Sequence, residues 1–272
     1  MKKIFILVAL LFMMTGCGSK SFEVGYSSNM LKEKDREELK TILKDNKVSN
    51  VDTFISWLED YNKDDDKNCG MKDWIKTSDL VYDDVACVER YEKNHDVSDG
   101  NCRLTAFTLI SDLLSINKTL KNNGTYLMLD DDVLETNANY KLVSDQYDKF
   151  VTIYGETDIS NVKKEDIKNV FNKKWTDNGI KINSNTVSLI SIVMHDNIGN
   201  ILFVGHTGVL IELSDKLIFI EKIAFELPYQ VSVFKTRDEL KEMIFSRTNY
   251  FADGTEEGPF IYENDKLIYE YK

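Results

Sequence analysis

Three apolar segments in the second half of the chain determine its fold class: TVSLISIVM (186–194), ILFVGHTGVLIE (201–212) and LIFIEKIAFE (217–226). They are rich in Val, Ile, Leu and Phe, and the short polar stretches HDNIG (195–199) and SDK (214–216) separate them. Apolar runs of this length between turn residues predict β-strands. Because such short turns join antiparallel neighbours, we expect an antiparallel sheet.

Further elements are expected around these strands. Strands are predicted at Phe150–Tyr154 and Tyr229–Phe234, and two short strands around Asn264-Asp265 close the chain. A helix is expected over Lys163–Trp175. Another is expected over Thr236–Ser246, where Thr236 and Glu239 have the spacing of a capping box.

The first half of the chain has helical periodicity. The segments LKEKDREELKTILKD (31–45) and VDTFISWLEDY (51–61) each place their apolar residues on one stripe, and Asn50 is a plausible N-cap for the second. A weakly helical region extends to Glu92, and a strongly apolar helix is expected over Cys102–Leu120. Helices followed by strands indicate an α+β fold, which we place in a single domain over 31–272.

Composition excludes several classes of function. The 272 residues include 46 acidic and 34 basic side chains, which give a net charge of −12, and 42% of the chain is hydrophobic. This is the composition of a globular protein, and its charge disfavours binding to nucleic acid. No glycine-rich phosphate loop and no paired His or Cys motif occurs. We therefore expect no nucleotide, no metal and no other cofactor.

The N-terminus has the form of an export signal. Lys2 and Lys3 precede an apolar run over 4–14, and the residues Thr15-Gly16-Cys17 resemble the lipobox of bacterial lipoproteins. The resemblance implies a signal peptide over 1–16 and a lipid on Cys17. That lipid would anchor the protein in the membrane, on the extracellular face of the cytoplasmic membrane. An ordinary secretory peptide is the alternative. Residues 17–30 have little periodicity and are expected to form a tether.

Three cysteines remain beyond Cys17. Cys69 and Cys87 lie in the same stretch and either form a disulfide or both stay free, so Cys102 is the odd thiol. Asp99-Gly100-Asn101 delivers Cys102 to the start of an apolar helix, where free amides and the helix dipole favour a thiolate. The alternative is a small buried core residue.

A histidine and an acid lie on neighbouring predicted strands. If Ser214 and Asp215 form the turn, His206 faces Ile223, and Glu221 lies one diagonal step away on the same face. Cys102, His206 and Glu221 then have the types of a nucleophile, a base and an orienting acid. The alternatives are a structural His206 and a Glu221 bonded to Lys222 or to a backbone amide.

The order of these residues resembles that of papain-like cysteine hydrolases. HTGV (206–209) is similar to the H-x-G-[IV] strand of NlpC-type cell-wall peptidases, and DGNC (99–102) resembles the D-G-x-C of ovarian-tumour-type deubiquitinases. NCRLTAF (101–107), GHTGVLI (205–211) and FIEKIAFELPYQ (219–230) together resemble an uncharacterised Gram-positive lipoprotein family, domain of unknown function 4300.

The resemblance implies a papain-like fold in which the cysteine helix packs on the C-terminal antiparallel sheet. It also implies hydrolysis of a peptide or amide bond, with cell-wall peptides as the natural substrate. Arg103 follows the cysteine where papain-type enzymes carry an aromatic residue. The oxyanion donor is not evident, and Asn101, the Cys102 amide and Gln230 are the candidates. The alternative function is a lipoprotein that binds a ligand on this fold without catalysis.

Overall fold

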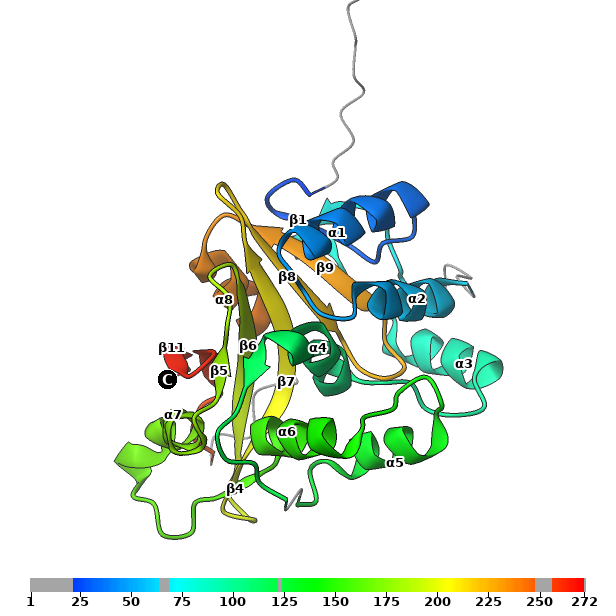
Figure 1. Cartoon of the computed structure of the whole chain (residues 1–272). Coiled ribbons are helices and arrows are strands. Elements are labelled where there is room, and N and C mark those ends of the chain that lie inside the picture. Colours follow the sequence, from blue (N-terminus) through cyan, green and yellow to red (C-terminus); the bar gives the residue numbers. More distant parts are fainter. Residues whose placement is uncertain (1–21, 64–68, 122–123, 248–255, 272) are drawn as a thin grey trace, which may run out of the picture.

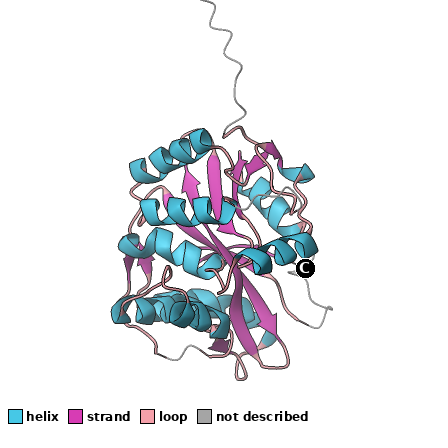
Figure 2. Cartoon of the chain, turned by 90° about the vertical axis from the view of Figure 1, so that its right-hand side faces the viewer, coloured by secondary structure: helices cyan, strands magenta, loops and turns pink. Residues whose placement is uncertain are grey.

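A central antiparallel sheet with helices on both faces forms the core of the protein (Figures 1 and 2). The computed structural model describes residues 22–63, 69–121, 124–247 and 256–271. Helices α1 to α7 pack against one face, where Phe171 and Trp175 of α7 belong to the same core as α1 to α6, and α8 packs against the other (Figure 1). This mixture of helices and antiparallel strands confirms the α+β class.

The helices and strands are as follows. The helices are α1 (Glu33–Asp45), α2 (Val51–Asn62), α3 (Asp84–Asn94), α4 (Cys102–Ile110), α5 (Met128–Thr136), α6 (Ser144–Tyr154), α7 (Ile167–Asn178) and α8 (Arg237–Phe245). Short 3₁₀ turns are η1 (Thr77–Asp79), η2 (Ser111–Leu113) and η3 (Lys164–Asp166). The strands are β1 (Tyr26–Ser28), β2 (Ile75–Lys76), β3 (Leu114–Ser115), β4 (Thr157–Asp158), β5 (Lys181–Ile182), β6 (Val187–Asp196), β7 (Ile201–Glu212), β8 (Leu217–Lys222), β9 (Tyr229–Phe234), β10 (Phe260–Glu263) and β11 (Lys266–Glu270).

Strands β6 to β9 form the centre of the sheet, in the order β11-β10-β6-β7-β8-β9-β1-β2, and β4 pairs with β7. Their side chains are buried on both faces. Val209 and Ile218 pack toward the helices α1 to α6, whereas Leu210 and Phe219 pack with Leu240 of α8. Burial on both faces explains why these strands are almost continuously apolar rather than alternating.

The hairpin of β7 and β8 has the register expected from the sequence. Glu212 pairs with Leu217 and Val209 pairs with Ile220. This ladder places Ser214 and Asp215 in the turn, because Leu213 donates its backbone N–H to the carbonyl of Lys216.

The prediction of a strand over Phe150–Tyr154 was wrong, since these residues form the last turns of α6. All five are buried, and the Phe150 ring meets Phe107 of α4 edge-on at 5.5 Å between centroids. A short apolar run fits a buried strand and a buried helix equally well. Only the periodicity of the whole helix, which begins at Ser144, distinguishes the two.

The helix expected over Cys102–Leu120 is shorter than predicted. It ends at Ile110, and the chain then forms η2 and pairs through β3 with β5. The apolar residues beyond the helix therefore continue the core in extended backbone.

The tether expected over 17–30 is wrong for its described part. Tyr26–Ser28 form β1, which pairs with β9 and β2, and Phe22 and Met30 are buried. The sequence pattern did not predict this strand because two of its residues are small and polar. Ser27 and Ser28 are buried through hydrogen bonds rather than apolar packing. The signal peptide over 1–16 and Cys17 lie outside the described residues.

Two further observations concern covalent and membrane structure. Cys69 and Cys87 form a disulfide, so Cys102 is the free cysteine of the described part. Among the described residues, every helix is too short or too polar to cross a bilayer.

Candidate active site

The cysteine stands at a tightly held helix start. Asn101 caps α4, because its side-chain oxygen accepts from the backbone N–H groups of Arg103 at 2.8 Å and Leu104 at 3.2 Å. Its side-chain nitrogen donates to Asp130 at 2.8 Å. Gly100 lies against the ring of Tyr140, where any side chain would collide. The cap therefore fixes the backbone of Cys102, the first residue of the helix.

A buried ion pair fastens this helix start to the sheet. The Arg103 guanidinium binds the fully buried Asp130 carboxylate of α5, with Nε at 3.1 and 3.2 Å from its two oxygens. Its Nη1 also donates to the Val204 carbonyl of β7 at 3.0 Å. The contacts thus run from Asp130 through Arg103 to Val204 of β7, two residues before His206.

His206 and Glu221 are in direct contact. His206 Nε2 lies 2.7 Å from Glu221 Oε2, and both side chains are buried. Both residues lie just beyond the β7–β8 ladder, which ends at Val209 and Ile220. Gly208 lies so close to the Phe219 ring that a side chain would collide with it. Since an ionised carboxylate only accepts, His206 donates through Nε2, and Nδ1 is the ring nitrogen left for another partner.

The thiol of Cys102 also hydrogen-bonds to the His206 side chain. Burial raises the pKa of Cys102, but the charge of His206, its hydrogen bond to the thiol and the nearby Arg103 outweigh burial. The pKa therefore lies below its usual value. A thiolate is the nucleophilic form of cysteine, so this shift favours reactivity.

Glu221 remains ionised although it is buried, because cationic and amide donors surround it. Arg247, just after α8, donates Nη1 and Nη2 to the two carboxylate oxygens at 2.7 and 2.6 Å. Gln230 donates to Oε1 at 3.3 Å. Burial raises the pKa of Glu221, but Arg247 and then His206 lower it to about 2. A carboxylate in this state holds the imidazole in one orientation.

A family comparison covers these residues. A family model described as "Domain of unknown function (DUF4300)" matches residues 26–268. The chain belongs to this family. No curated protein and no solved structure matches it. The matched range of this DUF4300 member contains every residue of the site described above and also begins with β1.

Of the residues expected from the sequence, the structure brings Cys102, His206 and Glu221 together. Two of the three oxyanion candidates are side chains, Asn101 and Gln230, and their amide nitrogens have other partners. That of Asn101 binds Asp130, and that of Gln230 binds Glu221 and Ser232. The backbone amide of Cys102 is the candidate that the Asn101 cap does not use.

Sequence reasoning missed Arg247 and Asp130. Arg247 is one basic residue after an amphipathic helix, and no local pattern connects it with Glu221. Asp130 stands in a run of three aspartates, a pattern typical of acids in the first turn of a helix. The first turn of α5 does contain Asp130 and Asp131, but Asp130 points inward to Arg103. The contact between this interior acid and the residue after Cys102 could not be predicted without tertiary information.

Lys222 lies on the opposite face of β8 from Glu221. It is fully buried, and its ammonium lies 3.5 Å from the ring centroid of Tyr61 and 4.3 Å from that of Tyr229. Burial lowers the pKa of Lys222 to about 7, although the charge of Asp99 raises it. Asp99 precedes the loop to Cys102, so a second ionisable cluster borders the site.

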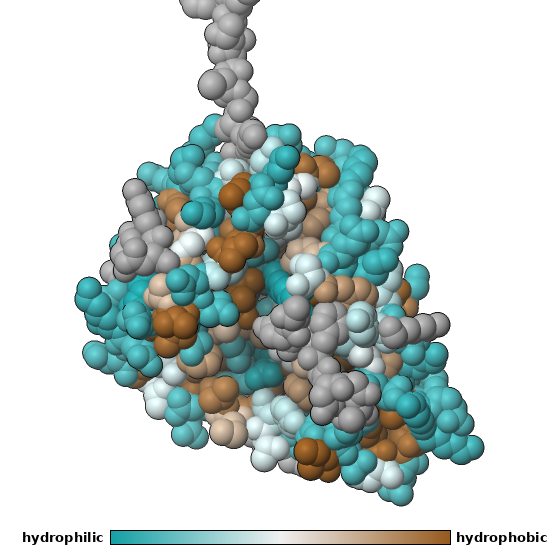
Figure 3. Space-filling view, turned by 180° about the vertical axis from the view of Figure 1, so that it is seen from behind, coloured by the Kyte–Doolittle hydropathy of each residue, from teal (hydrophilic) through white to brown (hydrophobic). Residues whose placement is uncertain are grey.

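A cleft of about 350 Å³ reaches the outer side of this network. Tyr82, Leu227 and Met243 line it beside Gln230 and Arg247, the two residues that hold Glu221. Seen from behind, the molecule is hollowed, and hydrophobic residues are exposed among hydrophilic ones (Figure 3). Among residues 22–63, 69–121, 124–247 and 256–271, no group of three His, Cys, Asp or Glu is placed to hold a metal.

Proposed function

We propose that this protein is a surface-anchored lipoprotein that hydrolyses peptide or amide bonds with Cys102 as nucleophile. His206 would act as base and then acid, and Glu221 would orient it. The contact of 2.7 Å between His206 and Glu221, beside a cysteine at a capped helix start, carries this proposal. Each residue has the partner that its role requires.

The reaction divides into two steps. The Cys102 thiolate attacks the substrate carbonyl and forms a C–S bond, while the His206 imidazolium gives its proton to the leaving nitrogen as the C–N bond breaks. Water then attacks the thioester, and His206 takes a proton from it. The C–S bond breaks, the acid product leaves, and the Cys102 thiolate and the His206 imidazolium are restored. The amide of Cys102 at the start of α4 is the candidate donor to the developing oxyanion.

The order of the three residues and the lipobox-like N-terminus support this proposal. A cysteine opening a helix, a histidine on one strand and an acid on the next strand is the order of papain-like hydrolases, and α4 packs against β7. The lipobox-like MTGC (14–17) favours anchoring through Cys17 outside the cytoplasmic membrane, where cell-wall peptides are the substrates at hand. The chemistry requires no cofactor.

The pH dependence of Cys102 alkylation tests the proposal. The mature protein without its lipid is alkylated across pH, and the labelled peptide is measured by mass. We expect Cys102 to react well below the usual thiol pKa of about 8.5. His206→Ala should remove this reactivity at low pH. A Cys102 that reacts slowly and is indifferent to His206 would exclude an activated pair.

Non-catalytic binding is the second candidate, and the burial of the site favours it. Cys102 is 6% exposed and His206 is 2% exposed, less than free access of a peptide requires. Under this reading, Cys102→Ala complements a deletion strain as well as wild type. Under the hydrolase proposal, the same variant folds and fails to complement.

A further inference from the structure

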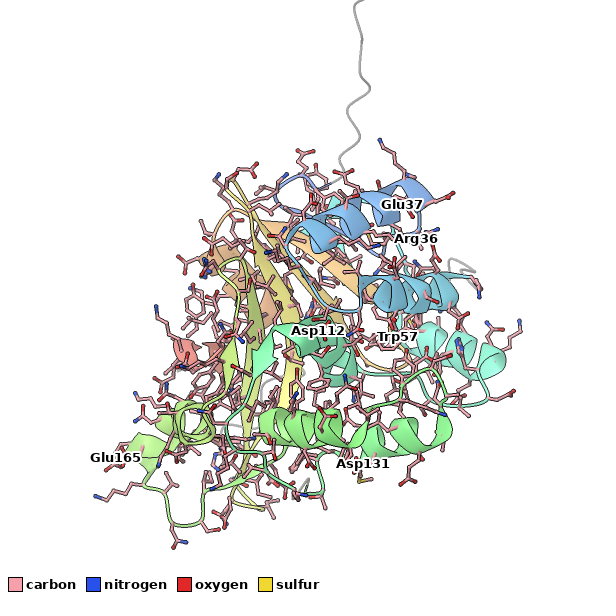
Figure 4. The ribbon with its side chains drawn as sticks, in the orientation of Figure 1. Arg36, Glu37, Trp57, Asp112, Asp131 and Glu165 are labelled. Carbon is pink, nitrogen blue, oxygen red and sulfur yellow. A yellow bond between two sulfur atoms is a disulfide. The ribbon has the colours of Figure 1, made fainter. Side chains whose placement is uncertain are left out.

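A cavity separate from the cysteine site lies among the helices. It has a volume of about 170 Å³ and is lined by residues of α2, α4 and α6 and of the segment 139–142. One wall is aromatic, because the rings of Trp57 and Tyr140 pack at 4.3 Å between centroids and 31° between planes. Trp57 lies on the side of α2 that faces α5 and α6 (Figure 4).

The rest of the lining combines polar side chains with leucines and a phenylalanine, and it is almost uncharged. Asn50, Asn139 and Gln146 contribute amide side chains, and threonine and serine hydroxyls lie between them. Lys141 is the one charged residue of this lining, and the lining has no acid. The chain has 46 acidic residues, and none of them lines this cavity. The lining therefore points to an uncharged ligand.

We propose that this cavity binds a neutral sugar ring, a hexose or an N-acetylhexosamine. The carbon–hydrogen face of a sugar packs on an aromatic wall, and its hydroxyls need partners that both donate and accept. Asn and Gln amides provide both functions. A fatty chain would leave these amides buried without partners, and an anion would meet Lys141 alone.

The amides retain capacity for a ligand. The Asn50 nitrogen donates to Thr108 and Ser111, which leaves its oxygen to accept. The Gln146 oxygen accepts from the Val143 backbone at 3.4 Å, which leaves its nitrogen to donate. Asn139 is exposed at the rim of the cavity. The lining thus offers an acceptor from Asn50 and a donor from Gln146 in addition to the aromatic wall.

The cavity borders the helix that carries Cys102 but is not the same site. Leu104, Phe107 and Thr108 of α4 line it, and the Tyr140 ring also packs on Gly100, before the cysteine. Sugar binding does not depend on hydrolysis, so either proposal can fail without the other.

Titration with N-acetylglucosamine and its β-1,4-linked tetramer tests the inference on the full chain without its signal and lipid. Binding is followed by tryptophan fluorescence and by saturation-transfer NMR of the sugar. We expect saturable binding that weakens at least tenfold in Trp57→Ala and in Asn139→Ala. The fluorescence change should disappear in Trp57→Phe and persist in the control Trp74→Phe, because Trp74 packs on Phe22 away from the cavity.

The outcomes separate the sources of the sugar. Equal affinity for the monomer and the tetramer indicates a free sugar, and tighter binding of the tetramer indicates a glycan chain. Circular dichroism checks that Trp57→Ala folds, and the exposed Asn139→Ala gives the same test without disturbing the core. Absence of saturation by about 10 mM of either sugar, or binding unchanged in both variants, would overturn the inference.

Discussion

Glu221 is ionised inside the protein because three neighbouring side chains direct donors at its two oxygens. Arg247 supplies two of these donors and a full positive charge, so the carboxylate is neutralised as well as oriented. A buried pair of this kind costs desolvation energy, and removing one partner leaves an uncompensated charge. The site is therefore better described as four coupled residues, with Arg247 positioning Glu221.

The Glu221→Gln variant should lose stability in a pH-dependent way. The pKa of Glu221 is lowered from 4.5 to about 2 in the folded protein. Its ionisation therefore stabilises the fold above pH 4.5, and this contribution is lost as the pH falls toward 2. We expect the variant to be about 3 kcal/mol less stable at pH 7, with the difference shrinking as the pH falls.

Urea unfolding at pH 7, 4.5 and 3 measures this difference. Glu59→Gln, which changes an exposed carboxylate on α2, serves as the control and should alter stability little at any pH. A loss in Glu221→Gln that is the same at all three values would show that packing, not ionisation, stabilises the site.

The charge of Lys222 should destabilise the fold, whereas the charge of Glu221 stabilises it. Its pKa falls from 10.5 to about 7 on folding, so the folded protein binds fewer protons than the unfolded chain between these values. Wild-type stability should therefore rise from pH 7 toward 10.5. Lys222→Met should lack this rise and gain about 1 kcal/mol or more at pH 6, because burying an apolar chain of similar size costs less.

The exposed Lys76→Met is the matched change for this measurement and should follow the wild-type curve. A Lys222→Met protein that is less stable than wild type at pH 6 would show that the contacts with Tyr61 and Tyr229 outweigh desolvation.

At the scale of elements, the N-cap of α4 links stability to reactivity. Asn101→Ala removes the acceptor of two backbone N–H groups and should cost about 1 kcal/mol. Because the same side chain binds Asp130, the helix start should also loosen. We then expect the apparent pKa of Cys102 to rise toward its ordinary value.

Asp83→Ala separates the two effects. Asp83 caps α3 in the same way, by accepting from the Ala86 N–H at 3.0 Å, but α3 carries none of Cys102, His206 and Glu221. It should cost similar stability and leave the pH profile of Cys102 alkylation unchanged. Equal profiles for both variants would refute a role of the α4 cap in activating the thiol.

The elements also show what the sequence could and could not predict. Strands β6 to β9 and the β7–β8 register followed from apolar runs and one short turn, since both are local properties. The predicted strand at Phe150–Tyr154 failed because five apolar residues fit either element. The candidate triad was found because Cys102, His206 and Glu221 each had a local signal. Arg247 and Asp130 had none, because tertiary packing alone brings them to the site.

At the scale of the whole molecule, the first described segment is part of the sheet, because β1 lies between β9 and β2. Ser27 of β1 hydrogen-bonds Ser232 of β9 at 2.7 Å, and Asn29 donates to the Tyr229 carbonyl of the same strand. Strand β9 in turn carries Gln230, which contacts Glu221. The first described residues therefore support the strand that borders the site.

A chain that begins at Leu31 should consequently be much less stable than one that begins at Phe22. Phe22 and Met30 are 2% and 0% exposed, and burying two such side chains contributes about 3 kcal/mol or more. Urea unfolding of both chains gives the stability, and Cys102 alkylation reports the site. The shorter chain should unfold at lower urea and lose its low-pH reactivity, since β9 would become an edge strand beside Glu221. Identical unfolding midpoints would mean that residues 22–30 are only a tether after all.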